Sequence, residues 1–514
     1  MSKNIKTALI SVYDKSKLKL LLKSLNKYKI KFISSGGTYK EIKKLGYKCT
    51  EVSKFTKSKE ILDGRVKTLH PKIHAGILSK KNKRSHMDEL RKNNFEKIEL
   101  VIVNFYPFDQ TLKQTNNHQK IIEKIDIGGP ALVRAAAKNY QDVTVITNTS
   151  QYDDLIEELN NNNGSTSLEF RTQLSLNAFT ETGCYDSSIS NYFNKKTKNF
   201  FPKKKLFYAN LIEKLRYGEN PHQKGALYSF NKYCGINQLQ GKKLSYNNYN
   251  DIFSAISISR SLPKNVGTVV VKHANPSGVS INKNKIKSFE LALKCDPISA
   301  YGGIVSCNFA IDKKMAKELN KIYLEVVIGT GISKEALNEF KMKKNLRVID
   351  STKFKIENFE NINTSYNNML VQSPDLKSLS RKDFKVVSKT KPNKKSFKNL
   401  IFAFNICRFV KSNAIVIVKE GSTVGIGSGQ PSRIDSCKIA ISKMKNFHKN
   451  LYKSETIAAS DAFFPFADGP ETLVHSGVSA IVQPSGSIRD KEIIKFANQA
   501  GIVLVFSKTR HFKH

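Results

Sequence analysis

The sequence contains no run of about 18 uninterrupted apolar residues, so we expect no membrane-spanning helix. The opening stretch, MSKNIKTALISVYDK, lacks the apolar segment and small-residue cleavage site of a signal peptide. The seven cysteines are scattered and include no Cys-x-x-Cys pair, which argues against a disulfide framework and against a cysteine-bound zinc ion. We therefore expect a cytoplasmic protein with reduced thiols.

Arginine is scarce: only 13 of the 86 basic residues are arginine, although the net charge is +43. The lysine excess is spread along the chain together with many asparagines, whereas a nucleic-acid reader more often clusters arginine with aromatic residues. We interpret the charge as a solvated surface that could also speed the capture of anionic small substrates. The alternative is a basic nucleic-acid-binding protein, whose binding to RNA would weaken steeply with salt.

The few arginines are informative because lysine is the default cation of this chain. An arginine then suggests a need for its planar, bidentate fork. Arg65, Arg216 and Arg433 lie in glycine- or proline-rich segments, and Arg510 lies near the end of the sequence. We expect these four side chains to bind phosphate or carboxylate groups.

A length of 514 residues predicts two to four domains. The first ~195 residues alternate between strand-like and helix-like patterns, which predicts a compact α/β domain with a mostly parallel sheet. Its strands are expected at Thr7–Val12, Lys31–Ser34, Leu100–Asn104 and Val143–Thr147, and its helices at Lys15–Tyr28 and Gly129–Asn139. The basic segment Asn194–Lys205 predicts a domain boundary, and a second boundary is expected near Val387–Lys395. Between and beyond them, strands are expected at Val266–Val271, Gly303–Cys307, Ala414–Val418, Ile457–Ala459 and Ile502–Phe506.

The segment Thr268–Gly278, TVVVKHANPSG, joins an apolar run to a lysine and a histidine. The run predicts a strand buried on both faces of a parallel sheet, and Asn275–Gly278 predicts a turn. Lys272 and His273 would then stand at the end of a buried strand, where open α/β sheets bind ligands. Either His273 carries a proton and the Lys272 ammonium adjusts its basicity, or the two are an ordinary surface lysine and a hydrogen-bonded histidine.

Several N-terminal motifs are rich in groups that bind anions or move protons. Ser34–Thr38 is a glycine turn between a strand and a helix, suited to phosphate, and Ser11 and Lys15 could face the same cleft. Arg65, Lys67 and Thr68 form a donor-rich loop that suits phosphate or an oxyanion. Tyr106, Asp126 and Lys138 could share proton transfer, although the sequence alone favours an ordinary surface or capping role for each of them.

Two further motifs are weak. His70 and His74 have the spacing of a metal pair, but no third ligand stands nearby, so we expect no metal site. Gly425–Gly429 reads Gly-x-Gly-x-Gly rather than the dinucleotide-binding pattern, so we expect no nicotinamide cofactor.

The order of these segments resembles one family, that of the bifunctional purine biosynthesis protein, in which AICAR formyltransferase is joined to IMP cyclohydrolase. The resemblance covers nearly the full length. It rests on SSGGT, LDGRVKTLHPKIHAGIL, NFYPF, DIGGPALVRAAAKN, LRYGENPHQ, VKHANPSG, SNAIVIV, GIGSGQPSR, SDAFFPFADG, QPSGSIRD and RHFKH.

The resemblance implies an α/β fold in three parts: a methylglyoxal-synthase-like cyclohydrolase domain over residues 1–196, then two cytidine-deaminase-like transferase subdomains over residues 203–386 and 387–514, without zinc ligands. It implies homodimers with transferase sites at the interface, AICAR and 10-formyltetrahydrofolate as substrates, and no tightly bound cofactor. The products would be tetrahydrofolate, then IMP and water.

The resemblance also assigns residues to the two reactions. For formyl transfer it implies catalysis by Lys272 and His273, with substrate-binding residues Arg216, Tyr217, Asn413, Arg433, Phe466, Asp468, Arg510 and His514. For ring closure it implies catalysis by Lys67, Tyr106, Asp126 and Lys138, with substrate-binding residues Ser11, Lys15, Ser35, Gly36, Gly37, Thr38, Arg65 and Thr68.

One residue departs from the family pattern. The family usually reads SVSDK where this chain reads Ser11-Val12-Tyr13-Asp14-Lys15, so Tyr13 replaces a small hydroxyl residue expected at the phosphate. Either the phenol of Tyr13 reaches the phosphate, or the ring narrows the cleft and another donor substitutes.

Overall fold

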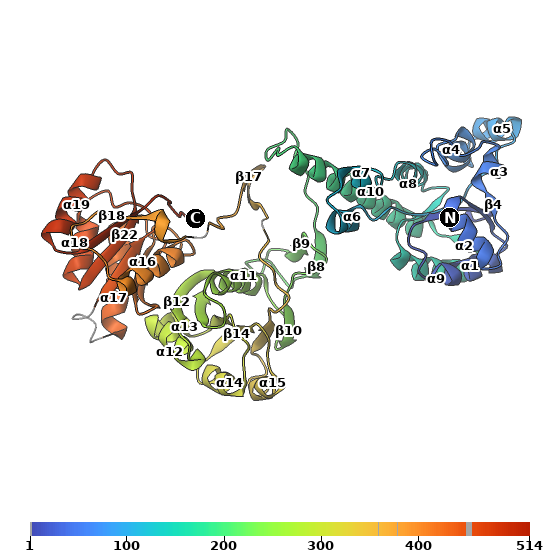
Figure 1. Ribbon diagram of the computed structural model, residues 1–514. Coiled ribbons are helices and arrows are strands. Elements are labelled where there is room, and N and C mark those ends of the chain that lie inside the picture. Colours follow the sequence, from blue (N-terminus) through green and yellow to red (C-terminus); the bar gives the residue numbers. More distant parts are fainter. Residues whose placement is uncertain (1–2, 358, 378, 449–454) are drawn as a thin grey trace. The chain divides into compact units, whose positions relative to one another are not determined.

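The computed structural model describes residues 3–357, 359–377, 379–448 and 455–514. The chain divides into two compact units, Met1–Tyr208 (unit 1) and Ala209–His514 (unit 2), each with its own hydrophobic core (Figure 1). The division into three domains over residues 1–196, 203–386 and 387–514 stays a prediction.

The centre of unit 1 is a five-stranded sheet in the order β4-β3-β2-β5-β6, with every neighbouring pair parallel. Short apolar runs form its inner strands because both faces of the sheet are covered. The mostly parallel sheet and the four predicted strands are confirmed. The strands of unit 1 are β1 (Lys3–Asn4), β2 (Thr7–Val12), β3 (Lys31–Ser34), β4 (Thr50–Glu51), β5 (Leu100–Asn104), β6 (Thr144–Ile146) and β7 (Ser165–Thr166).

Helices cover both faces of this sheet. Their buried apolar side chains join those of the strands in a single core. The longest helix, of 29 residues, packs on α8 and on β6. The helices of unit 1 are α1 (Leu18–Lys27), α2 (Gly36–Lys44), α3 (Val52–Thr56), α4 (Pro71–Leu78), α5 (Arg84–Lys92), α6 (Phe108–Gln114), α7 (His118–Ile122), α8 (Gly128–Lys138), α9 (Tyr152–Asn161) and α10 (Leu168–Lys196).

Unit 2 contains a twelve-stranded mixed sheet in the order β10-β15-β14-β13-β11-β12-β20-β19-β21-β22-β23-β18. Its strands are β10 (Asn237–Gln240), β11 (Gly267–Lys272), β12 (Asn275–Ile281), β13 (Gly303–Cys307), β14 (Leu324–Gly329), β15 (Arg347–Asp350), β18 (Phe384–Val386), β19 (Ile415–Lys419), β20 (Ser422–Gly427), β21 (Thr456–Ser460), β22 (Val478–Pro484) and β23 (Val503–Ser507). Two separate hairpins pair β8 (Asn210–Lys214) with β9 (Ala226–Ser229) and β16 (Asn361–Ser365) with β17 (Asn368–Gln372).

The large sheet consists of two halves with the same order of elements. In each half an edge strand and a helix precede a β-hairpin, and helices then alternate with three further strands. The halves meet where β12 pairs antiparallel with β20, at Ser280 and Ser422. The two halves thus repeat one order of elements. The first half reads α11-β11-β12-α12-β13-α14-β14-α15-β15, and the second reads α16-β19-β20-α17-β21-α18-β22-α19-β23.

Both faces of the large sheet are covered by helices. One core lies between the sheet and α11 (Tyr246–Ser261) and α16 (Lys394–Cys407). On the opposite face, the first half packs against α12 (Lys285–Cys295), α14 (Lys313–Asn320) and α15 (Lys334–Phe340). The second half packs there against α17 (Arg433–Phe447), α18 (Asp468–His475) and α19 (Asp490–Gln499). The short α13 (Pro297–Ala300) leads into β13.

The strand that ends at Lys272 differs from the prediction in two respects. β11 is buried on both faces, as expected, but it pairs antiparallel with both β12 and β13, so the predicted parallel pairing is wrong. The predicted turn at Asn275–Gly278 is also wrong, because these residues begin β12. The chain reverses instead at His273 and Ala274, whose φ angles are 52° and 56°. Pro276 is tolerated because it lies at an irregularity of the ladder.

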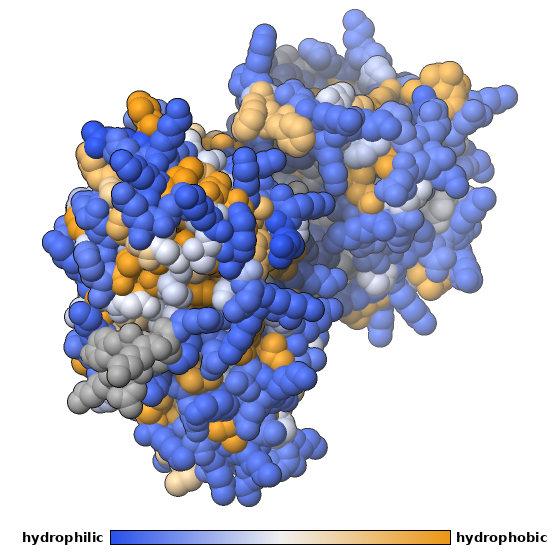
Figure 2. Space-filling view, turned by 60° about the vertical axis from the view of Figure 1, so that its left-hand side comes forward, coloured by the Kyte–Doolittle hydropathy of each residue, from blue (hydrophilic) through white to orange (hydrophobic). Residues whose placement is uncertain are grey.

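The described surface is mainly hydrophilic. Figure 2 shows hydrophilic residues over most of one face, with hydrophobic residues in small patches. None of the lysines in the described ranges is buried, which agrees with a solvated basic surface. Within the same ranges, no helix is both long and apolar enough to cross a membrane.

Candidate active sites

The first candidate site lies at the edge of the unit 1 sheet where β2, β3 and β5 end. Because parallel strands share one carboxyl edge, the segments that follow these strands meet there. Thr38, in the first turn of α2, donates a hydrogen bond to the carbonyl of Val12 at 2.9 Å and accepts one from its N–H at 3.0 Å. This pair ties the start of α2 to the end of β2, beside the half-buried Ser11.

Two lysines flank the glycine turn at the start of α2. A Cβ built on Gly36 would lie 3.4 Å from Nζ of Lys67, and one built on Gly37 would lie 3.8 Å from Nζ of Lys15. Lys67 also forms an ion pair with Glu60 at 3.1 Å. Two ammonium groups beside the N-terminus of a helix, whose N-cap Ser35 has no capping hydrogen bond of its own, suit a phosphate group.

Asp126 approaches the same edge from the segment before α8. Its Oδ1 accepts a hydrogen bond from the N–H of Gly129 at 2.8 Å, and its own N–H donates to the Tyr185 hydroxyl at 2.9 Å. Burial raises the pKa of Asp126, against the opposing hydrogen bonds from the backbone of Gly129 and Tyr106. Burial thus favours the protonated form of this carboxyl group more than water does, which makes Asp126 a candidate to hold or release a proton.

Tyr106 and Thr68 complete this cluster. Lys124 places its ammonium 5.6 Å from the centre of the Tyr106 ring, and Tyr13 packs edge-on against the same ring with centroids 5.6 Å apart. Thr68 reaches the start of α8, since a Cβ built on Gly128 would lie 2.8 Å from its Oγ1. The structure thus brings together the glycine turn at Ser35–Thr38, the two lysines, Tyr106 and Asp126.

Two predicted residues of unit 1 lie outside this cluster. Lys138 is the last residue of α8, ten residues after Gly128, which corresponds to about 15 Å along the helix. Its position at the far end of α8 separates it from Asp126, which precedes the start of that helix. The exposed Arg65 hydrogen-bonds Glu123, at the rim of the cluster.

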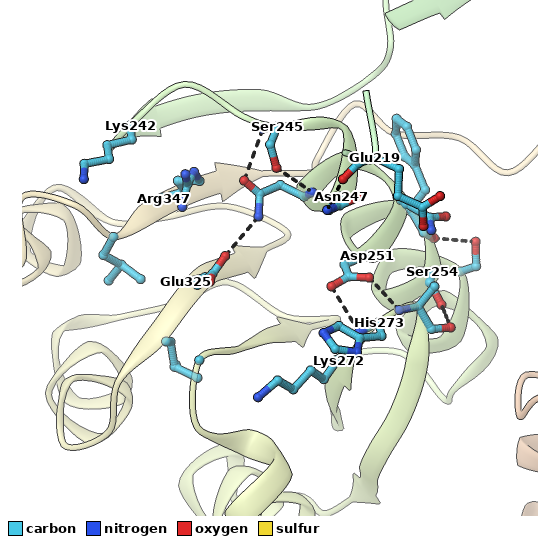
Figure 3. A pocket seen from close by; sticks show the side chains of 18 of the residues that line it. Glu219, Lys242, Ser245, Asn247, Asp251, Ser254, Lys272, His273, Glu325 and Arg347 are labelled. Atoms are coloured by element: carbon cyan, nitrogen blue, oxygen red, sulfur yellow. Dashed lines mark hydrogen bonds between the residues drawn. The ribbon is translucent and has the colours of Figure 1, made fainter. Parts of the chain in front are cut away.

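The second candidate site is a cavity of about 1700 Å³ in unit 2. Four predicted residues line it: Tyr217, Lys272, His273 and His514. Nζ of the half-buried Lys272 donates to the carbonyl of Tyr301 at 2.8 Å, which holds the ammonium at the cavity wall. His273 is exposed to the cavity, and Figure 3 shows its ring next to the Lys272 side chain.

The walls of this cavity carry both charge signs. Glu325 stands on the same side of the cavity as Lys242 and Arg347, whereas Asp251 stands beside His273 (Figure 3). The C-terminal segment adds Lys513, whose backbone pairs with Ser412: the Ser412 N–H donates to the Lys513 carbonyl at 2.9 Å. Burial lowers the pKa of the Lys513 ammonium.

Asn413 and Arg433 form a separate, mostly buried network. Arg433 donates to Oδ1 of Asn413 at 2.6 Å and to Oγ of Ser460 at 2.8 Å, and it forms an ion pair with the fully buried Asp461. The Arg433 guanidinium is therefore held by internal acceptors, and its direct effect in this structure is to orient Asn413.

The other predicted residues of unit 2 lie apart from the cavity lining. Arg216 is exposed and near the ring of Tyr217, with 5.9 Å from its guanidinium carbon to the ring centre. Phe466 is exposed under the guanidinium of Arg489 at 4.6 Å. Asp468 begins α18, and the exposed Arg510 stacks on Phe512 at 4.3 Å.

Two residues that sequence reasoning missed hold the predicted ones in place. Asp251, on α11, binds the turn at His273, and Tyr185, on α10, binds the segment at Asp126. Neither stands in a recognisable motif. The only signal was the polar run Asn247-Asn248-Tyr249-Asn250-Asp251 at the start of α11.

His70 and His74 have separate local roles in the structure. Nδ1 of His70 accepts a hydrogen bond from the Lys72 N–H at 3.1 Å and so caps α4, and burial lowers the pKa of His74. Over the described ranges, we find no group of three or more histidine, cysteine or acidic side chains arranged to hold a metal ion.

The fold and the two clusters define an α/β protein with two separate candidate active sites, one in each unit. Two family models match it: "MGS-like domain" over residues 18–131 and "AICARFT/IMPCHase bienzyme" over residues 136–443. The chain belongs to the AICARFT/IMPCHase bienzyme family.

Full-length relatives agree with this assignment. The chain is 41% identical to the bifunctional purine biosynthesis protein PurH of Bradyrhizobium diazoefficiens, with 100% of this chain and 99% of the relative covered. It is 42% identical to the proteins of the same name from Leptospira biflexa and Rhodospirillum rubrum, with 99% of each chain covered. Among solved structures, "Crystal structure of ForH" is 28% identical with a TM-score of 0.34, covering 37% of this chain and 99% of that chain.

Proposed function

We propose that this chain catalyses the last two steps of IMP synthesis. The first step transfers a formyl group from 10-formyltetrahydrofolate to the 5-amino group of AICAR, and the second closes the ring of formyl-AICAR to IMP with loss of water. The observation that carries the proposal is the Lys272-His273 pair on the wall of a cavity, in a chain related over its whole length to bifunctional PurH proteins. Nothing in these relationships favours the nucleic-acid-binding alternative.

For formyl transfer, we assign the chemistry to the unit 2 cavity. The AICAR amino group is a weak nucleophile because its lone pair is delocalised, so it needs a base as it attacks the formyl carbon. His273 removes the amino proton, and the Lys272 ammonium stabilises the oxyanion that forms on the formyl oxygen. Collapse of this intermediate breaks the bond to the folate nitrogen, which takes up the proton held by His273, and releases tetrahydrofolate.

For ring closure, we assign the chemistry to the edge of the unit 1 sheet. The carboxamide nitrogen of formyl-AICAR attacks the formyl carbon within the same molecule, so orientation supplies much of the rate. Ser35–Thr38 with Lys15 hold the phosphate end, and Lys67, Tyr106 and Asp126 surround the reacting groups and move protons. Lys138 remains a predicted catalytic residue. Because it lies at the far end of α8, the cyclisation rates of Lys138 and Asp126 variants should be compared directly.

The remaining parts of the proposal concern partners. We expect 10-formyltetrahydrofolate to act as a co-substrate rather than a tightly bound cofactor. We also expect a cytoplasmic homodimer in which a second copy contributes to the transferase site. Four predicted residues that do not line the cavity could then contribute to the site of the second copy and should be tested for it. They are Asn413 and Arg433 of the buried network and the exposed Phe466 and Asp468.

The deciding experiment is a coupled assay with AICAR and 10-formyltetrahydrofolate that follows the appearance of IMP. The wild-type protein should form IMP. His273→Ala should abolish formyl transfer while added formyl-AICAR is still converted to IMP. Normal formyl transfer by His273→Ala would overturn the assignment of the base.

A further inference from the structure

The turn that carries His273 rests on one face of α11. Oδ2 of Asp251 accepts a hydrogen bond from the His273 N–H at 3.2 Å, and Oδ1 accepts one from the Ala274 N–H at 2.5 Å. Ser254, one helical turn further along α11, donates from its hydroxyl to the Ala274 carbonyl at 2.8 Å. Figure 3 shows both side chains of α11 directed at the turn.

This turn has a backbone conformation that its residues do not favour. His273 and Ala274 both have positive φ angles, 52° and 56°, and neither is glycine or asparagine. Such a two-residue turn suits a hairpin, but a Cβ makes the left-handed region unfavourable, so the conformation needs support from outside the hairpin. The Asp251 carboxylate supplies that support by accepting from two successive N–H groups.

The second half of the sheet provides an internal comparison. Asn399 is the sixth residue of α16, as Asp251 is the sixth residue of α11. Oδ1 of Asn399 accepts a hydrogen bond from the N–H of Gly421 at 2.9 Å, and Gly421 is the second residue of the corresponding turn. A side chain at this helix position therefore holds the hairpin in both halves. The two halves differ in two ways. The first half uses a carboxylate with two acceptor oxygens, whereas the second uses an amide. In the first half both turn residues with positive φ carry a Cβ, whereas in the second half one of them is Gly421.

We propose that Asp251, assisted by Ser254, is a positioning residue for formyl transfer: it fixes the left-handed turn that aims His273 into the cavity. The inference rests on the function proposed above. It assigns Asp251 no contact with the reacting atoms. It predicts that the turn geometry, rather than the presence of a negative charge, is what formyl transfer requires.

The test uses the full-length protein and measures both activities of each variant. Asp251→Ala should lower kcat for formyl transfer about 10- to 100-fold with little change in KM for AICAR, because displacing a catalytic group by about 1 Å has effects of this size. Asp251→Asn should retain most of kcat, because an amide oxygen can still accept from Ala274, as that of Asn399 does from Gly421. Cyclisation of added formyl-AICAR should stay at the wild-type rate in both variants, which shows that unit 1 is intact. A denaturant unfolding transition of unit 2 close to that of wild type shows that unit 2 is folded as well.

A second-site substitution separates geometry from charge. Ala274→Gly removes the Cβ that opposes positive φ, so adding it to Asp251→Ala should restore part of the lost kcat. Asn399→Ala is the matched control: it removes the corresponding hydrogen bond in the other half and should leave kcat close to wild type.

Three results would overturn the inference: a normal kcat in Asp251→Ala, a loss in Asp251→Asn as large as in Asp251→Ala, or no recovery on adding Ala274→Gly. Absence of formyl transfer in the wild-type protein would instead reject the proposed function. The two failures are therefore distinguishable.

Discussion

Tyr13 directly follows β2, at a position where the resemblance to the family predicts a small hydroxyl residue. Its backbone N–H donates to Oδ1 of Asn104 at 2.7 Å, and its ring meets the Tyr106 ring at an angle of 72°. The contact gives Tyr13 a role in supporting Tyr106 that does not depend on its hydroxyl.

Tyr13→Ser should therefore slow ring closure about 2- to 10-fold, the range that corresponds to the loss of one aromatic pair. Tyr13→Phe should behave like wild type. Steady-state assays of formyl-AICAR cyclisation give kcat and KM for each of the two variants. If Tyr13→Phe raised KM instead, the hydroxyl would be a phosphate ligand, and the ring contact alone would not explain what Tyr13 does.

Asp126 illustrates how a partly buried carboxyl group can lower stability. Burial raises its pKa above the ordinary value of 3.8. The contribution of Asp126 to the free energy of unfolding is therefore highest below pH 3.8, where the carboxyl group is protonated. It falls as pH rises through the folded-state pKa. At pH 7 its ionised form opposes folding. Asp126→Asn keeps an acceptor for the Gly129 N–H, so it should unfold at the same or a higher temperature than wild type at pH 7.

The same variant should cyclise formyl-AICAR about 10²- to 10⁴-fold more slowly, because a positioned proton carrier is lost. Thermal unfolding and cyclisation rates, compared with those of Lys138→Ala, test both statements. A markedly lower unfolding temperature for Asp126→Asn would show that the ionised carboxylate stabilises the fold at pH 7 rather than opposing it. A larger loss of activity in Lys138→Ala would move the proton transfer away from Asp126.

Among the elements, two glycines of the Gly425–Gly429 segment, Gly425 and Gly427, have a packing role. A Cβ on Gly427 would lie 1.9 Å from the Ser436 carbonyl oxygen, and one on Gly425 would lie 2.1 Å from that of Ala440, so α17 lies directly on β20. Gly427→Ala should destabilise unit 2 by about 1–3 kcal/mol through overpacking. Gly183→Ala, where an added Cβ meets nothing within 4 Å, is the control. Denaturant unfolding gives the free energy of unfolding of each variant. The packing role would be refuted if this free energy were the same in both variants as in wild type.

Strands that are short buried apolar runs could be predicted from the sequence, often to within a residue, because burial on both faces leaves a local signal. β3, β5 and β13 lie where they were expected. Pairing direction could not be predicted, because β11 has the apolar run of a parallel strand yet both of its neighbours are antiparallel.

The turn at His273 was also missed, because His-Ala carries no turn signal and the Asn-Pro-Ser-Gly that follows does. Its conformation depends on Asp251, a residue 22 positions away in the chain, and no local pattern records that contact. The candidate site residues were found as motifs. Their supports, Asp251 and Tyr185, became visible only when distant elements were brought together.

At the scale of the whole molecule, the two candidate sites belong to units with separate cores, so each reaction should be removable without the other. His273→Ala should accumulate no formyl-AICAR, and Asp126→Asn should accumulate it from AICAR and 10-formyltetrahydrofolate. When the two purified variants are mixed with both substrates, IMP should form again after a lag, because the intermediate made by one protein is consumed by the other. The lag should shorten as the concentration of His273→Ala is raised. A mixture that forms formyl-AICAR but no IMP would show that ring closure requires the intermediate to be delivered within one molecule.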